Sequence, residues 1–151
     1  MNVEQRQNLL STLAKSSLKD IQSCWHHSPD DYQFKTIRPP QTGMVMAVAR
    51  TETTGDPFNL GEVSVTRCAL RLESGETGFG YSMGSDKEQV LHIALIDALA
   101  QVEGNFDQLS IEVITPLKQK ITDRQKRQKA LADTTKVDFV TILINLQIVQ
   151  E

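Results

Sequence analysis

The chain has 151 residues, a formal net charge of −3 and an aromatic content of 5%. A chain of this length can bury about 68–70% of its unfolded surface, so we expect one domain over residues 1–151 that folds without a disulfide or metal. The negative charge argues against nucleic acid and anionic membranes as partners, and the few aromatic residues argue against a base-stacking platform. With no apolar run of signal-peptide or membrane-span type, we expect a cytoplasmic protein.

The first 25 residues predict two short helices. Ser17 and Asp20 have the spacing of a helix N-terminal cap. A helix–turn–helix DNA reader has a similar pattern, but Lys19 is the only basic residue of the second helix, and phosphate contact needs several. We therefore favour a plain helical hairpin. Its apolar residues form two stripes at helical spacing: Leu9, Leu10, Leu13 and Ala14, then Leu18, Ile21 and Trp25.

One short cluster has metal-ligand chemistry. Cys24, His26 and His27 lie together, but the remaining histidine, His92, is distant in sequence. Structural zinc sites usually pair two such clusters at regular spacing. We therefore expect no metal site, and solvated imidazoles at a helix end.

Residues 32–50 predict two strands. In the first, Tyr32, Phe34 and Thr36 alternate with polar neighbours, and the strand is expected to end at Arg38-Pro39-Pro40. The second, Gly43 to Arg50, is an apolar run typical of a central strand buried on both faces. Residues 51–59 predict a loop. The next strand, Gly61 to Leu72, changes its apolar parity near Thr66-Arg67, which indicates either a β-bulge or a strand buried on both sides with Arg67 paired to a carboxylate.

The strand from Gly78 to Met83 has two unlike faces. Phe79, Tyr81 and Met83 share one face, which we assign to the core. Gly78 and Gly80 share the other, so a ligand or a neighbouring chain is expected to approach the backbone closely there. Together, residues 61–100 predict a docking corner made of a long strand, a turn, this strand and a helix.

The helix after this strand is expected to begin with a capping box from Ser85 to Glu88. Helix N-termini can bind anions, and Lys87 adds positive charge, but the glycine spacing matches neither a dinucleotide fingerprint nor a P-loop. The helix is apolar nearly all round, which indicates a buried position or an interface. In a chain of this size we favour an interface with another protein, with Leu91 and Leu95 as candidates.

The last third predicts a helical region from Asn105 to Leu131, interrupted near Thr115-Pro116, and a strand from Lys136 to Val149. The fold class is therefore α+β. It has an N-terminal helical hairpin, a mainly antiparallel sheet of about five strands and two further helical regions before a C-terminal strand. The basic residues between Lys118 and Lys129 form either a solvated face or a binding surface for an acidic subunit or a polyphosphate.

Several blocks resemble PhnG, a family of the bacterial carbon–phosphorus lyase system. They keep the family's order over most of the chain: RPPQTGMV (38–45), PFNLGEVSVTRCALRL (57–72), GYSMGSDK (80–87), DAL (97–99) and KVDFVTI (136–142). The chain departs from the family at two places. The family commonly has arginine at the position of Ser85, and Ala-Glu at the position of Leu91-His92.

The resemblance implies a subunit of a cytoplasmic hetero-oligomer. With the components PhnH, PhnI and PhnL, such a subunit supports transfer of the ribose triphosphate moiety of ATP to methylphosphonate with release of adenine, and PhnJ carries out the later carbon–phosphorus cleavage. ATP is then a substrate of the complex, and no cofactor is bound by this chain alone. The subunit is expected to be accessory, and inactive when isolated, because the nucleosidase-like chemistry is usually placed on PhnI.

The residues themselves give no nucleophile or metal signature. Adenine displacement needs cationic groups for the polyphosphate and an acid for the leaving base. Arg67, Asp86 and Lys87 are therefore the candidates to line or support such a site, and structural ion pairing is the alternative for all three.

Overall fold

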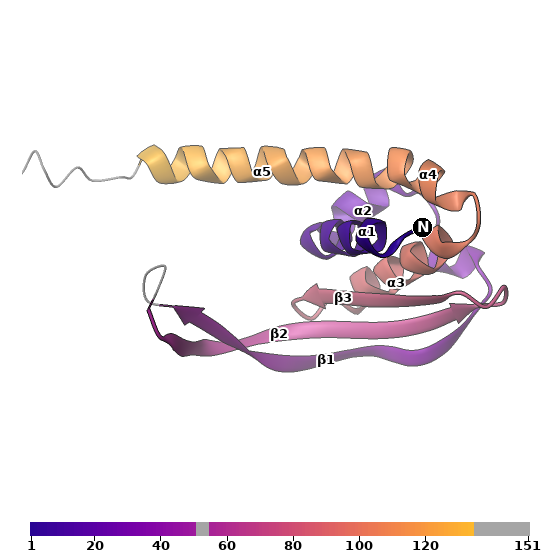
Figure 1. Ribbon diagram of the computed structural model, residues 1–151, viewed down its shortest axis with the longest axis horizontal. Helices are drawn as coiled ribbons and strands as arrows, with labels where there is room; N and C mark the ends of the chain where they lie inside the picture. The colour runs from indigo at the N-terminus through magenta and orange to yellow at the C-terminus, as the bar shows by residue number, and fades with distance from the viewer. Residues whose placement is uncertain (51–54, 135–151) are drawn as a thin grey trace, which may run out of the picture. The chain divides into compact units, whose positions relative to one another are not determined.

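The computed structural model describes residues 1–50 and 55–134, and Figure 1 shows the arrangement of its helices and strands. The chain divides into two compact units, Met1–Lys120 and Ile121–Glu151. The first unit has two layers, a sheet and a group of helices on one of its faces. No helix of the described residues is long and apolar enough to cross a membrane.

The predicted N-terminal helical pair is confirmed as α1 (Val3–Lys15) and α2 (Leu18–Cys24). The side chain of Asn2 caps α1 by accepting from the backbone N–H of Gln5 at 2.8 Å. Ser17 caps α2 as expected, since its hydroxyl accepts from the backbone N–H of Asp20 at 3.2 Å. A short 3₁₀ turn, η1 (Pro29–Asp31), leads into the sheet.

The sheet is antiparallel, as predicted, but it has three strands in the described residues instead of about five. Its order is β1 (Phe34–Arg50), β2 (Pro57–Leu72) and β3 (Thr77–Met83). One expected strand is missing because residues 34–50 form a single strand. The other, Lys136 to Val149, lies outside the described residues. Pro39 and Pro40 do not end β1 because it is an edge strand, where a missing N–H can face outward.

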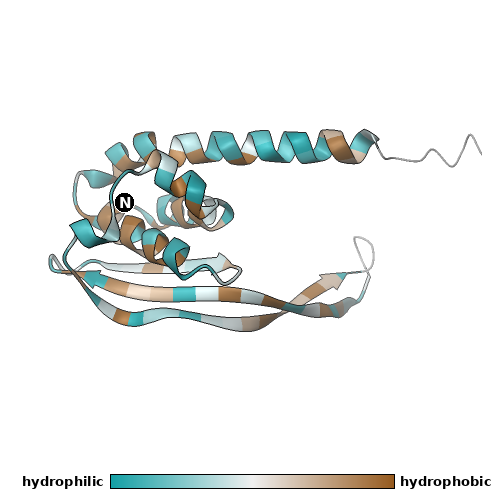
Figure 2. Cartoon of the chain, turned by 180° about the vertical axis from the view of Figure 1, so that it is seen from behind, coloured by the Kyte–Doolittle hydropathy of each residue, from teal (hydrophilic) through white to brown (hydrophobic). Residues whose placement is uncertain are grey.

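The expectation that Gly43 to Arg50 is a central, buried strand is wrong. Met44 is 69% exposed and Val48 is 61% exposed. Pairing between β2 and β3 ends at Val65 and Met83, so beyond this point β1 and β2 continue as a two-stranded ribbon (Figures 1 and 2). β2 begins at Pro57, which shortens the loop expected over residues 51–59.

The change of parity near Thr66-Arg67 is not a bulge in β2. β2 pairs with β3 in unbroken register from Val65 to Arg71. The irregularity near these residues lies in β1. Arg38 pairs with Ala69 and Gln41 pairs with Arg67, so three residues of β1 span the same length as two residues of β2. The parity changes because Thr66, Cys68 and the leucines after them face the helices, whereas Val63 and Val65 belong to the opposite face.

Helix α3 (Lys87–Gln101) lies between the sheet and the other helices of the first unit. It is followed by α4 (Asn105–Leu109), the π-helical turn η2 (Ser110–Ile114) and α5 (Thr115–Thr134). The helical segment continues from α4 through η2 into α5, so the interruption expected near Thr115-Pro116 takes the form of a π-helical turn that ends just before Thr115. The core of the chain is formed by fully buried residues that include Leu9, Leu13, Ile21, Leu70, Val90, Ile93, Leu95, Ile96, Val113 and Leu117.

Candidate functional site

The sheet has one covered face and one open face. Thr66, Cys68 and Leu70 of β2 are buried toward α3, and the positions between them point the other way. We call the open side the outer face. The strand register arranges the residues of this face in five rows across the sheet. Arg38 is assigned to its row because it lines the same groove as Phe79 and Ala69. The rows are Val45 and Val63; Gly43, Val65 and Met83; Gln41, Arg67 and Tyr81; Arg38, Ala69 and Phe79; Lys35, Arg71 and Thr77.

The outer face carries large exposed apolar side chains. Phe79 is 52% exposed, Tyr81 49% and Met83 68%. The assignment of these three residues to the core is therefore wrong. The reason is that α3 packs on the glycine side of β3, so the side chains that alternate with the glycines must point outward.

A shallow groove of about 440 Å³ crosses the outer face. Its floor includes the small Ala69, and the exposed arginines Arg38 and Arg67 lie on its lining with Phe79 and Tyr81. Within the described part of the chain neither arginine forms an ion pair. The groove thus combines apolar contact area with two guanidinium groups that are available to carboxylate or phosphate.

The predicted site residues Arg67, Asp86 and Lys87 do not come together. Arg67 lies on the outer face, opposite Tyr81 in the sheet register. Asp86 and Lys87 lie at the start of α3, in the helix layer. No hydrogen bond or ion pair joins Arg67 to either of them in the described residues.

Asp86 has a structural role at this corner. Its carboxylate accepts from the backbone N–H of Gln89 at 3.0 Å, so Asp86 is the N-cap of α3 and Lys87 is the first helical residue, exposed to solvent. The expected capping box from Ser85 to Glu88 is therefore not formed, and the cap lies one residue later, at Asp86. A carboxylate at this position interacts favourably with the helix dipole, which accounts for the preference over Ser85.

The close approach to Gly78 and Gly80 is made by α3 of the same chain. A Cβ atom at Gly78 would lie 1.9 Å from the carbonyl oxygen of Ala94, and one at Gly80 would lie 1.9 Å from that of Val90. Leu95 is fully buried under this contact, and Leu91 is half-buried. The chain itself therefore covers the helix that we expected another protein to cover.

An ion pair between a partly exposed arginine and a fully buried aspartate, which was not predicted from the sequence, joins two helices of the first unit. Arg6 of α1 donates to both carboxylate oxygens of Asp97 in α3, at 2.9 and 2.7 Å, and the backbone N–H of Phe79 donates to the same carboxylate at 2.9 Å. The hydrogen bond to Asp97 raises the pKa of Arg6. The sequence did contain a signal for this ion pair. Asp97 is a charged residue among the apolar residues of α3, and a buried charge needs a partner.

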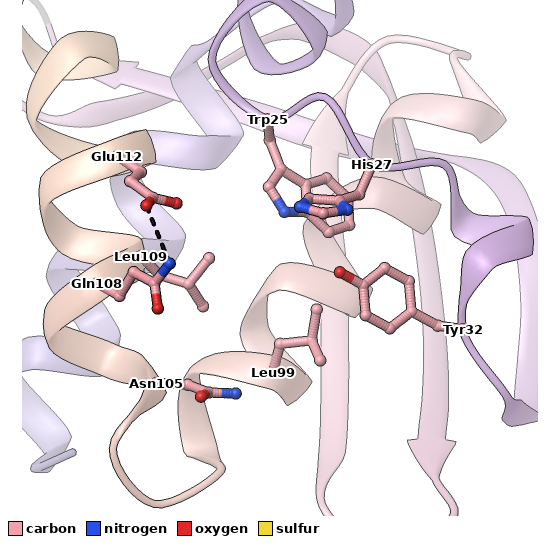
Figure 3. Close-up of a pocket in the computed structure, with 8 residues that line it drawn as sticks. All are labelled: Trp25, His27, Tyr32, Leu99, Asn105, Gln108, Leu109 and Glu112. Carbon is pink, nitrogen blue, oxygen red and sulfur yellow. Dashed lines mark hydrogen bonds between the residues drawn. The ribbon is translucent and has the colours of Figure 1, made fainter.

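A second, smaller pocket lies beside Trp25. In Figure 3 the polar side chains of Asn105, Gln108 and Glu112 lie across from the rings of Trp25, His27 and Tyr32. Gln108 donates to Glu112 at 3.0 Å. The volume is about 160 Å³, which is below the roughly 300–1,000 Å³ of ordinary ligand pockets. His27 thus belongs to an aromatic cluster with Trp25 and Tyr32.

These features define a class of protein: a two-layer α+β domain with a tightly packed helix layer and an open sheet face suited to contact with another molecule. The chain belongs to the PhnG family, because the family's sequence profile, described as phosphonate metabolism protein PhnG, matches residues 4–143. It is also 34% identical over 142 residues to the alpha-D-ribose 1-methylphosphonate 5-triphosphate synthase subunit PhnG of Rhizobium meliloti (strain 1021). That alignment covers 93% of this chain and 90% of the relative. The resemblance that the sequence blocks indicated is confirmed.

Proposed function

We propose that this chain is a subunit of an α-D-ribose 1-methylphosphonate 5-triphosphate synthase. The observation that carries the proposal is the end-to-end match to a curated synthase subunit, at 34% identity over 93% of the chain. The reaction is the transfer of the ribose triphosphate moiety of ATP to methylphosphonate with release of adenine. The partners are the PhnH, PhnI and PhnL components, with PhnJ acting on the product, and the complex is cytoplasmic.

The subunit has an accessory role in this reaction, and it is inactive by itself. The separation of Arg67 from Asp86 and Lys87 supports this role, because a polyphosphate transfer needs its cationic and acidic groups around one substrate. The groove on the outer face is open, whereas small-molecule sites enclose most of their ligand. A DNA-binding role gains no support, since α2 has seven residues and Lys19 is its only basic one.

Reconstitution tests this function. The chain is co-expressed with PhnH, PhnI and PhnL from the same organism, and adenine release from ATP and methylphosphonate is measured by chromatography. We expect adenine release by the full set, and only background release by the chain alone or by the set without it. An equal rate with and without the chain would overturn the proposal.

A further inference from the structure

The outer face is an apolar surface that the first unit leaves without cover. The described helices of this unit, α1 to α4, lie on the opposite side of the sheet (Figure 1). Ile37 is 51% exposed and lines the groove with Phe79 and Tyr81, and the exposed Met83 follows Tyr81 on the same face of β3. A contiguous apolar area of this kind on a folded protein marks an interaction site.

The dimensions of this face suit a protein surface. Five rows of paired residues are separated by four steps of two residues, so the face runs for about 27 Å along the strands at about 3.4 Å per residue. A small ligand would contact a fraction of that length. The composition agrees, because tyrosine, phenylalanine, methionine and arginine are enriched in protein–protein interfaces.

The positive charge of the outer face indicates which kind of protein partner it fits. Its five rows carry Lys35, Arg38, Arg67 and Arg71, and they carry no aspartate or glutamate. Two copies of this chain that met through this face would bring like charges together, which disfavours a symmetric dimer. An acidic surface with apolar side chains at its centre is complementary to it.

We propose that the outer face docks another protein through an apolar centre at Phe79 and Tyr81, flanked by ion pairs from Arg38 and Arg67 to carboxylates of the partner. This inference rests on the proposed function in one respect, namely that the partner belongs to the synthase assembly. The docking side of the chain is then the open face of the sheet, and the helix layer serves to hold that face rigid.

Charge reversal tests the docking. The variant Arg38→Glu/Arg67→Glu is co-expressed with the synthase components, beside the control Lys19→Glu/Lys87→Glu, which makes the same change in net charge at two exposed helical lysines. We expect the first variant to lower the fraction assembled, measured by native mass spectrometry, at least tenfold, and the control to assemble as the parent does. Thermal melting of the isolated variants tests whether both are folded.

Oxidative footprinting gives a second readout that does not depend on a substitution. We expect Met83 and Tyr81 to be oxidised readily in the isolated chain and protected several-fold in the complex. Protection in the isolated chain would mean that the chain or a second copy covers this face, and would overturn the docking proposal. Equal assembly of the Arg38/Arg67 variant and the parent would overturn it as well. A parent chain that forms no complex would overturn the docking and the proposed function together.

Discussion

The two faces of β3 differ in exposure, and the difference is the opposite of what the sequence pattern predicts. Gly78 and Gly80 make one face look empty, yet it is the covered face, pressed against the backbone of α3. Phe79, Tyr81 and Met83 make the other look like a core, yet it is the open face. The absence of side chains allows close packing, because the backbone of β3 can then meet the backbone of α3. The aromatic side chains are left on the exposed face, where the guanidinium of Arg6 lies 5.7 Å from the centroid of the Phe79 ring.

The largest expected effect comes from filling the glycine face. In Gly80→Ala the new Cβ would lie 1.9 Å from the carbonyl oxygen of Val90, and a helix backbone cannot move aside as a side chain would. We expect a loss of about 3 kcal/mol or more in the free energy of unfolding, up to failure to fold. Urea denaturation of the isolated chain measures it.

Gly43→Ala is the matched control, because nothing lies within 4 Å of a Cβ at that strand position. We expect its stability to equal or slightly exceed that of the parent. Similar losses for the two variants would mean that β3 and α3 do not pack backbone to backbone.

Removing the Arg6–Asp97 ion pair should have the next largest effect on the free energy of unfolding. In Arg6→Met the carboxylate of Asp97, which is 0% exposed, keeps only the backbone N–H of Phe79 as a donor from the described part of the chain. We expect a loss of about 2–3 kcal/mol, since an unpaired buried charge is costly. The double variant Arg6→Met/Asp97→Asn should recover much of this loss in the same urea measurement, because the neutral amide no longer needs a cation. A double variant that is less stable than Arg6→Met would contradict a stabilising role of the ion pair.

The covered face should also make stability depend on pH at high values. Burial raises the pKa of the Cys68 thiol from 9.0 to about 11. The unfolded chain therefore loses this proton at lower pH than the folded chain does, so the free energy of unfolding should fall as pH rises from about 9 to about 11. We expect the fall from this group to be about 1–2 kcal/mol.

The contribution of Cys68 is isolated by comparison with Cys68→Ala, which keeps Cys24 and every other titrating group. Urea denaturation at about pH 8 and about pH 10.5 should show a steeper loss for the parent than for the variant. Equal losses in the two chains would show that the thiol is not shielded by α3.

The smallest effect is expected at the cap of the helix that covers the glycine face. Asp86→Ala removes the acceptor for the backbone N–H of Gln89 and should cost about 1 kcal/mol. Ser85→Ala should change stability by less than about 0.3 kcal/mol, because Ser85 lies outside the helix and is exposed. The reverse order in thermal melting would place the cap at Ser85, as the local pattern alone predicts.

Much of the local structure could be predicted. Helical spacing located α1 and α2, and the Ser17 cap was recognised from its partner at Asp20. The Asp86 cap was missed by one residue, because Ser85 and Asp86 are both good caps and only the geometry of the corner separates them. Gly43 to Arg50 was misassigned for a similar reason, since an apolar run has the same pattern in a buried strand and in an exposed ribbon.

The candidate site was harder to predict. Arg67 was predicted as a cationic group for a polyphosphate site, and it does lie on the open face, but Arg38, which lines the same groove, was not predicted. Asp86 and Lys87 were grouped with Arg67 because the expected reaction needs an acid and cationic groups around one substrate. The sheet separates them, since Arg67 points away from the layer that contains α3.

The sequence by itself determined the alternation in β3, the apolar character of α3 and the family of the chain. All three follow from local periodicity or from ordered blocks of residues. Only the tertiary structure decided which face of β3 is covered, because a period of two separates the faces without naming the inner one. The glycine face is covered because α3 packs on it. The backbones of α3 and β3 meet where Cβ atoms are absent, and the aromatic residues are left on the outer face.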